Sequence, residues 1–379
     1  MQAIINGKIV TETKVILDHV LVFDEEIQQI IDQAQFTQDD QMQVIDAQGQ
    51  YIAPGFINQH VHGCDGFDAM DVEPESLAHI AQCLAQTGVT SFLPTTMTYD
   101  FSTIHQSLKL IRENMQLQHG AEIIGCHMEG PFINKDYKGA HDAQYIVPPD
   151  FELIKDYIDV IKIITVAPEV IKDEIFIEKC KAAGIILSLG HSGASYEEAI
   201  AAIKNGISHV THICNALPVL HHRQPGVVGA ALDSGVMCEL IADNVHVHPA
   251  MQRIIWKAKG TDHIVLVTDS MRACMLRDGE YELGGQPVFV KDKVARLENG
   301  VIAGSVLTMD QAVKIFKENT QVNLCDAIKT VTINPAKELG IYDRKGSLDV
   351  GKQADIIVFD ENIGIKATFV KGKAVFRRK

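Results

Sequence analysis

Residues 123–132, which read IIGCHMEGPF, constrain the fold of this chain more than any other stretch. The apolar run at their start is typical of a strand that is buried on both faces. Gly130-Pro131 ends that strand, and because side chains alternate along a strand, His127 and Glu129 lie on one face. A carboxylate at the end of a buried strand is costly unless something pairs with it or binds it. For an isolated Glu, a salt bridge or a cap would be the simpler explanation.

Four further apolar segments end in the same manner, and the repetition favours a functional explanation. Segments 185–189, 209–212 and 264–267 lead to His191, His212 and Asp269, and segment 56–62 carries His60 and His62 on one strand face. A single such histidine is usually structural. Imidazoles and carboxylates at five strand ends, however, are the ligands that Zn²⁺ or a similar divalent cation prefers. The pattern therefore predicts a metal centre where these strand ends meet.

The alternation of apolar runs with helical patterns predicts the architecture around that centre. Helices are expected at 74–86, 101–119, 172–183, 196–205 and 249–259. Counting from Phe56 gives eight strands that are separated mostly by helices, which matches a TIM-like (β/α)₈ barrel with its functional groups at the carboxyl ends of the strands. A doubly wound open sheet is the competing architecture. It would not normally aim residues from the first, third, fifth, sixth and eighth strands at one point.

Both ends of the chain predict short strands. In the block 1–52, Asn6-Gly7 between β-prone residues is a hairpin signal, and the block 345–379 returns to strands. Because 50 residues bury a poor core alone, we expect the two blocks to form one small discontinuous β-sandwich domain beside a barrel of residues 53–344. The remaining expectations are a hairpin insertion at 272–300, a helix at 308–317 with Thr308 and Gln311 as a capping box, and a helix at 324–332 that stops at Asn334-Pro335.

Charge and cysteine content exclude several classes of protein. The formal net charge is −15, with 49 acidic against 34 basic residues, which argues against nucleic acid or an anionic membrane as a general partner. The eight cysteines contain no CxxC pair, so neither a disulfide framework nor a zinc ribbon is indicated. The N-terminus lacks a signal-peptide pattern, and no apolar stretch reaches the ~20 residues of a membrane span. We expect a soluble, cytoplasmic protein.

Nine short motifs, spread in order over nearly the whole chain, resemble those of one family. They are APGFINQHVH at 53–62, HMEGPF at 127–132, LGHS at 189–192, THICNALP at 211–218, HRQPG at 222–226, DNVHV at 243–247, VTDS at 267–270, AGSVLTM at 303–309 and GKQADIIV at 351–358. The sequence resembles the amidohydrolase superfamily and, within it, most closely the N-acetylglucosamine-6-phosphate deacetylase family.

This resemblance implies specific roles at the metal centre. Glu129, His191 and His212 would be the principal ligands, and Asp269 would be the catalytic acid and base. His60 and His62 would permit a second ion, although the pair could equally be vestigial. The ions, one or two per subunit, would be Zn, Fe or Mn. On position alone, Asp269 could instead cap the next helix.

The resemblance also implies the substrate contacts. His141 would touch the acetyl carbonyl beside the backbone of Ala140; without the resemblance it would be an ordinary surface histidine. Sugar and phosphate contacts, and the lining of the site, would come from Asn215, Ala216, Arg223, His246, Ile302, Ala303 and Gly304. In this family the arginine corresponding to Arg223 reaches the neighbouring subunit's site, which implies a homodimer; the alternative is a mobile surface arginine. Arg272 is a second possible anion contact without an assigned role.

The implied activity is metal-dependent hydrolysis of the N-acetyl amide of a phosphorylated amino sugar, N-acetyl-D-glucosamine 6-phosphate, in amino-sugar catabolism. A sister amidohydrolase acting on N-acetylgalactosamine 6-phosphate or on a cyclic amide is the first alternative. Ring-opening relatives commonly bridge two metals with a carboxylated lysine, and Glu129 at the matching position disfavours them. A barrel scaffold without catalysis is the second alternative, and the complete ligand set speaks against it.

Overall fold

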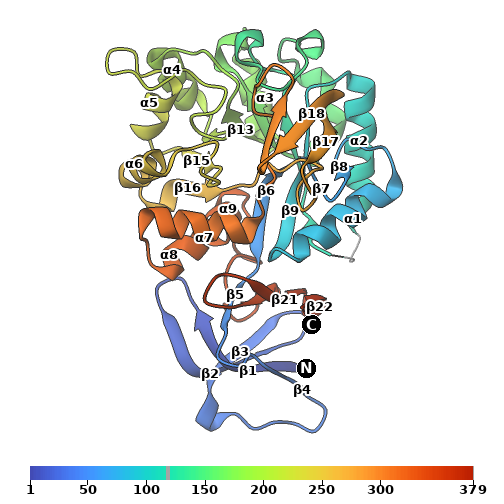
Figure 1. Cartoon of the computed structure of the whole chain (residues 1–379), viewed down its shortest axis with the longest axis vertical. Helices are drawn as coiled ribbons and strands as arrows, with labels where there is room; N and C mark the ends of the chain where they lie inside the picture. Colours follow the sequence, from blue (N-terminus) through green and yellow to red (C-terminus); the bar gives the residue numbers. More distant parts are fainter. Residues whose placement is uncertain (117–119, 379) are drawn as a thin grey trace.

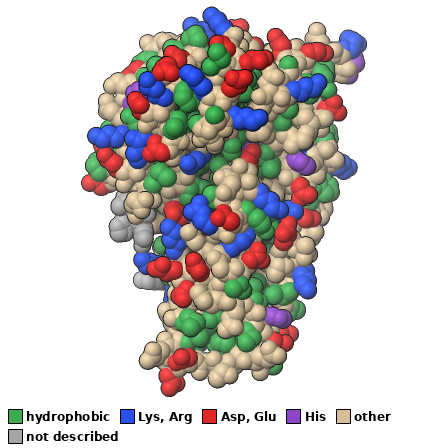
Figure 2. Space-filling view, turned by 180° about the vertical axis from the view of Figure 1, so that it is seen from behind, with side chains coloured by type: hydrophobic (Ala, Val, Ile, Leu, Met, Phe, Trp, Pro, Cys, Tyr) green, Lys and Arg blue, Asp and Glu red, His purple; other side chains and the backbone are tan. Residues whose placement is uncertain are grey.

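The computed structural model describes residues 1–116 and 120–378 of the chain. Figure 1 shows a large barrel surrounded by helices, with a small sheet domain at one end that contains both termini. None of the described helices is long and apolar enough to cross a membrane. On the face shown in Figure 2, acidic and basic side chains are intermixed.

Parallel strands form the barrel in chain order. They are β6 (Phe56–Val61), β9 (Val89–Thr96), β11 (Cys126–Glu129), β12 (Ile161–Val166), β13 (Ile186–Leu189), β14 (His209–Val210), β15 (Met237–Leu240) and β16 (Ile264–Leu266), with the short β10 (Glu122–Ile123) beside β9. A parallel bridge between Val61 and Ser270 joins the first strand to the end of the last. This contact closes the ring, so the expected (β/α)₈ barrel is confirmed and the open sheet is not.

Helices cover the outside of the barrel and pack their apolar residues against the strands. They are α1 (Pro74–Ala85), α2 (Phe101–Asn114), α3 (Ile175–Ala182), α4 (Tyr196–Asn205), α5 (Gly226–Leu232), α6 (Pro249–Lys259), α7 (Met309–Thr320), α8 (Leu324–Lys329) and α9 (Ile333–Glu338), with 3₁₀ turns η1 (Gln33–Gln35), η2 (Lys135–Tyr137), η3 (Ala143–Tyr145), η4 (Phe151–Leu153), η5 (Lys155–Tyr157), η6 (Pro168–Val170) and η7 (Thr261–His263). The helix expected to reach residue 119 ends at Asn114, and positions 117–119 lie outside the described residues. The short helix α5 was not expected from the sequence.

Strands from both termini join in one sheet with the order β22-β21-β20-β5-β1-β2-β3, and β4 also pairs with β1. These strands are β1 (Gln2–Val10), β2 (Val15–Phe23), β3 (Ile27–Asp32), β4 (Gln43–Asp46), β5 (Tyr51–Pro54), β20 (Ile356–Phe359), β21 (Ile365–Val370) and β22 (Lys373–Arg377). Phe23 and Phe369, from opposite ends of the chain, meet edge to face with ring centroids 5.6 Å apart. The N-terminal block thus shares a core with the C-terminal one.

Three local expectations were wrong. Asn6-Gly7 forms no hairpin, because both residues lie within β1, where a register shift and φ of 55° at Asn6 mark a bulge. A Cβ at Gly7 would lie 2.3 Å from Ile52 Cδ1, so this glycine permits close strand packing. Thr308 makes no capping hydrogen bond with its side chain; its hydroxyl instead bonds to Asp310. Pro335 does not act as a helix stop, because it lies in the first turn of α9, a position that tolerates proline.

An antiparallel insertion follows the last barrel strand and borders the barrel mouth, as expected for 272–300. It contains three strands, β17 (Gly279–Leu283), β18 (Gln286–Lys291) and β19 (Val294–Leu297). Its Leu283 packs in one cluster with Met97 and Met271. A second small ladder, β7 (Gly63–Cys64) with β8 (Phe67–Asp68), follows β6.

Candidate active site

The carboxyl ends of the barrel strands surround a cavity of about 300 Å³. It is lined by His62, Met97, Glu129, Gly139, Ala140, His141, His191, His212, Asn215, Ala216, His246, Asp269, Leu283, Val301, Ile302 and Gly304. Four of the non-glycine residues, His191, His212, Ala216 and Asp269, have positive φ values between 29° and 50°. Such strained backbone is concentrated at functional sites. It is found here where each strand stops and its next side chain turns into the cavity.

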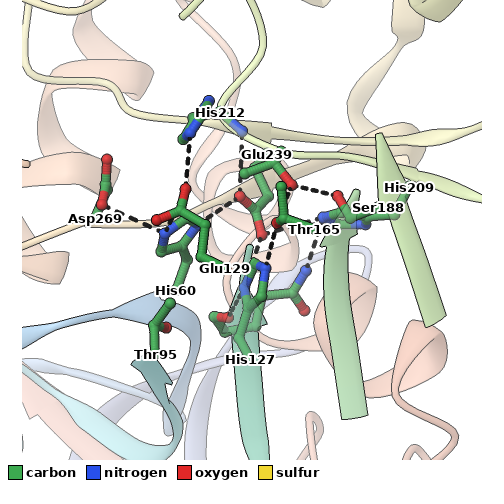
Figure 3. A network of polar contacts seen from close by, with 12 residues as sticks. His60, Thr95, His127, Glu129, Thr165, Ser188, His209, His212, Glu239 and Asp269 are labelled. Carbon is green, nitrogen blue, oxygen red and sulfur yellow. Dashed lines mark hydrogen bonds and ion pairs between the residues drawn. The ribbon is translucent and has the colours of Figure 1, made fainter. Parts of the chain in front are cut away.

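Glu129 lies at the centre of the ligand set (Figure 3). Its Oε1 lies 3.1 Å from His191 Nε2 and 3.0 Å from His212 Nε2, and these two nitrogens are 3.1 Å apart. Its Oε2 lies 3.2 Å from His62 Nε2, which is itself 3.2 Å from Asp269 Oδ1. Ligand atoms around a tetrahedral ion with bonds near 2.0 Å are separated by about 3.3 Å. Glu129 Oε1, His191 Nε2 and His212 Nε2 already lie at about that spacing.

The ring orientations leave the Nε2 atoms free to bind a cation. His62 Nδ1 lies 3.1 Å from the Thr95 carbonyl oxygen, and His191 Nδ1 lies 2.9 Å from that of Tyr137. Because a carbonyl only accepts, each Nδ1 carries a proton, so in its neutral form each ring presents a lone pair on Nε2. His60 Nε2 is buried and has no hydrogen-bond partner. A divalent cation fits this set of nitrogens and carboxylate oxygens.

Electrostatics keep the carboxylates of the site ionised. Burial raises the pKa of Glu129, but the charge of His60 and hydrogen bonds from His141 and His191 outweigh it and hold that pKa well below its ordinary value. Burial also raises the pKa of Asp269, but His60 and His62 outweigh it and lower that pKa below its ordinary value. For His62, hydrogen bonds to Asp269 and Glu129 outweigh burial and raise its pKa to about 9. Burial and the neighbouring His141 lower the pKa of His191 to about 4.

His141 is fixed as a hydrogen-bond donor toward the cavity. The backbone N–H of Thr98 donates to its Nδ1 over 3.2 Å, so in the neutral ring the proton lies on Nε2. This Nε2 is 3.4 Å from Glu129 Oε2. An N–H group beside the metal ligands is placed where it can stabilise an oxygen that gains negative charge.

Comparison with known proteins assigns the family. The family model described as the amidohydrolase family matches residues 51–375. The chain belongs to the amidohydrolase family.

Three similar proteins narrow the comparison. The N-acetylglucosamine-6-phosphate deacetylase of Bacillus subtilis (strain 168) is 40% identical over 337 residues, 86% of this chain and 85% of its own length. The N-acetylgalactosamine-6-phosphate deacetylase of Escherichia coli O157:H7 is 35% identical over 336 residues, 87% of this chain and 89% of its own. The crystal structure of N-acetylglucosamine-6-phosphate deacetylase from Pasteurella multocida has a TM-score of 0.94 at 32% identity, and the alignment covers 100% of both chains.

Two of the candidate metal groups in this amidohydrolase share Glu129 at the barrel mouth. One contains His60, His62 and Glu129, and the other contains Glu129, His141 and His191; within each group the ligand atoms lie within 4.8 Å of one another. The family is metal-dependent, and apart from His141, whose Nε2 carries a proton, these residues provide the ligands that such an ion requires.

The remaining residues expected in the site divide into four groups. Ala140, Asn215, Ala216, His246, Ile302 and Gly304 line the cavity. Ala303 is fully buried and does not line it. Arg223 is exposed, its Nη1 lies 2.7 Å from His222 Nε2, and it does not line the cavity of its own chain. Arg272 bonds to Asp71 and Glu282, 3.0 and 2.8 Å away, which gives it a structural contact to the insertion.

The sequence reasoning missed the polar side chains beneath the cavity. Glu239 is fully buried in β15 and lies 2.9 Å from His60 Nδ1. A charged residue inside the apolar run 236–242 was a visible signal of the same kind as Glu129. Met97, Leu283 and Val301, which line the cavity from separate segments, gave no such signal, because apolar residues are ordinary in any core.

Proposed function

We infer that this amidohydrolase hydrolyses the N-acetyl amide of N-acetyl-D-glucosamine 6-phosphate, releasing acetate and D-glucosamine 6-phosphate in amino-sugar catabolism. The observation that carries this inference is the convergence of Glu129, His191 and His212 within 3.1 Å beside an ionised Asp269. Similarity at 40% identity to a deacetylase of that substrate supports it. The cyclic-amide and scaffold alternatives have no comparable support.

The metal centre is assigned to the same residues. Glu129, His191 and His212 would hold one divalent ion, Zn, Fe or Mn, and His60 and His62 would contribute to a second. When bound, such an ion polarises a carbonyl group and lowers the pKa of water toward ~7. An amide is a poor electrophile and neutral water is a poor nucleophile, so the reaction needs both effects.

Two side chains of the protein move or hold protons in this mechanism. Asp269 is ionised and therefore accepts a proton from the attacking water, then delivers it to the departing amine nitrogen. His141 donates its Nε2–H to the amide carbonyl oxygen as that oxygen gains charge. The backbone of Ala140 lies beside it in the cavity wall.

Phosphate recognition requires a positive group that the cavity does not supply. Among the described residues, the lining contains Asn215, Ala216 and His246 but neither lysine nor arginine. Arg223 lies on an exposed segment beside Val219 and Leu220, which are 86% and 41% exposed. Exposed apolar residues next to a guanidinium are typical of an interface. We propose a homodimer in which Arg223 completes the phosphate site of the neighbouring subunit.

Subunit mixing tests this arrangement. Arg223→Ala and Asp269→Asn chains should each be nearly inactive, but their co-expression should restore about a quarter of wild-type activity, since half of randomly paired dimers are mixed and each has one intact site. Differently tagged chains permit purification of the mixed dimer alone. A mixture no more active than the sum of its parts, or a monomer in light scattering, would contradict the proposal.

Acetate release from phosphorylated and unphosphorylated N-acetyl hexosamines tests the activity itself. We expect turnover of N-acetyl-D-glucosamine 6-phosphate, a large loss without the phosphate, and slower turnover of the galactosamine epimer. Preference for the epimer would assign the chain to the activity of its E. coli relative. We place the reaction in the cytoplasm, which suits the eight free cysteines.

A further inference from the structure

A buried carboxylate beneath the cavity takes no part in the mechanism proposed above. Glu239 is 0% exposed. Its Oε2 lies 2.9 Å from His60 Nδ1 and accepts the backbone N–H of His212 over 3.2 Å. Its Oε1 lies 3.2 Å from His209 Nε2. Glu239 therefore contacts two of the proposed metal-ligand residues, His60 and His212, as Figure 3 shows.

A second carboxylate, Glu338, lies on the outer side of Glu239, and His209 lies between the two. His209 Nδ1 lies 2.5 Å from Glu338 Oε1, on α9. Burial opposes the charge of His209, but Glu338 and Glu239 outweigh it and raise its pKa to about 10. A cationic His209 therefore lies between two carboxylates, and the groups form a continuous row from α9 through His209 and Glu239 to His60.

The neighbouring His127 does not compete for Glu239. Its Nδ1 lies 3.0 Å from the Gln59 carbonyl oxygen, and its Nε2 lies 2.7 Å from the Thr165 hydroxyl. Both ring nitrogens are thus occupied, whereas its distance to Glu239 Oε1 is 3.7 Å. His60 is the imidazole that Glu239 orients.

The other nitrogen of His60 has no hydrogen-bond partner. His60 Nε2 is buried and lies 3.4 Å from Asp269 Oδ1 and 3.6 Å from Glu129 Oε1. Since His60 Nδ1–H donates a hydrogen bond to Glu239, this ring presents Nε2 toward two carboxylates and the neighbouring His62. A ligating histidine in proteins typically donates its other N–H to a carboxylate or carbonyl in this manner.

We propose that Glu239 is a positioning residue that orients His60 as a ligand of a second divalent ion, bound among His60, His62, Glu129 and Asp269. The inference rests on the proposed metal centre and assigns His60 and His62 a working role. Loss of an outer carboxylate of this kind typically weakens metal affinity by about 10–100-fold.

Metal titration of Glu239→Gln, which keeps the shape and removes the charge, tests the proposal. Apoprotein is equilibrated with graded free Zn²⁺, and bound metal is measured by elemental analysis and calorimetry. Wild type should bind two equivalents per chain; the variant should bind the first unchanged and the second about 10–100-fold more weakly. Asp310→Asn, a carboxamide change at a half-buried site outside this row, should bind both as wild type does.

A double variant separates positioning from general structural damage. If Glu239 acts through His60, then Glu239→Gln added to His60→Asn should weaken Zn²⁺ binding no further than His60→Asn alone. Additive losses, an equal weakening of both equivalents, or wild-type binding in Glu239→Gln would overturn the proposal, as would a single equivalent in wild type at all Zn²⁺ concentrations. Because these readouts count metal rather than acetate, failure of the proposed activity would be recognised separately.

Discussion

Asp269→Asn should lower acetate release from N-acetyl-D-glucosamine 6-phosphate by a factor of about 10²–10⁴, the usual contribution of a positioned acid or base. The substitution keeps the size of the side chain but removes its ability to accept a proton. KM should change little, because in the proposed mechanism Asp269 contacts the reacting water rather than the sugar. Steady-state kinetics with an acetate-coupled assay give both quantities.

Two controls accompany this measurement. Asp262→Asn, which changes a surface carboxylate 2.7 Å from Lys329, should retain full turnover. Metal content should be measured in parallel, because Asp269 Oδ1 lies only 3.2 Å from His62 Nε2. Retained activity in Asp269→Asn with normal metal content would exclude it as the proton carrier.

Lys345→Met should lower the free energy of unfolding by about 3–5 kcal/mol, because it leaves the buried Asp355 without its cation and Glu122 with Lys371 alone. Lys345 is 2% exposed, and its Nζ lies 2.6 Å from Glu122 Oε2 and 2.5 Å from Asp355 Oδ2. Glu122 belongs to barrel strand β10, whereas Asp355 directly precedes β20 of the terminal sheet. Lys345 therefore links the two parts of the molecule. Calorimetric and urea-induced unfolding measure the loss.

The same cluster predicts a pH dependence of stability. Burial raises the pKa of Glu122, but Lys345 and Lys371 outweigh it and lower the pKa below its ordinary value of 4.5. The stabilisation is therefore fully present above pH 4.5 and is lost as the pH falls through the lowered value. Lys345→Met should lose most of this acid dependence. Lys109→Met, which removes an exposed pair 4.0 Å from Glu113, should unfold as wild type does.

Much of the fold and the gathering of candidate ligands at the barrel mouth could be predicted because both depend on local patterns. Helices α4 and α6 begin and end where their sequence patterns indicated. Glu129, His191, His212 and Asp269 each follow an apolar run, and a closed barrel brings all its strand ends to one mouth. Asn6-Gly7 failed as a hairpin signal because pairing with neighbouring strands outweighs turn propensity.

The sequence by itself determined that Glu129, His191, His212 and Asp269 would meet, because strand periodicity and strand ends are properties of short segments. Only the tertiary structure decided how each one is held. His60 and Glu239 are 179 residues apart, and the Thr98 N–H that orients His141 comes from another strand's end 43 residues away. Such hydrogen bonds depend on the register and spacing of the closed barrel, which no local pattern encodes. The tertiary structure likewise decided that Arg223 is exposed and lies outside the cavity of its own chain.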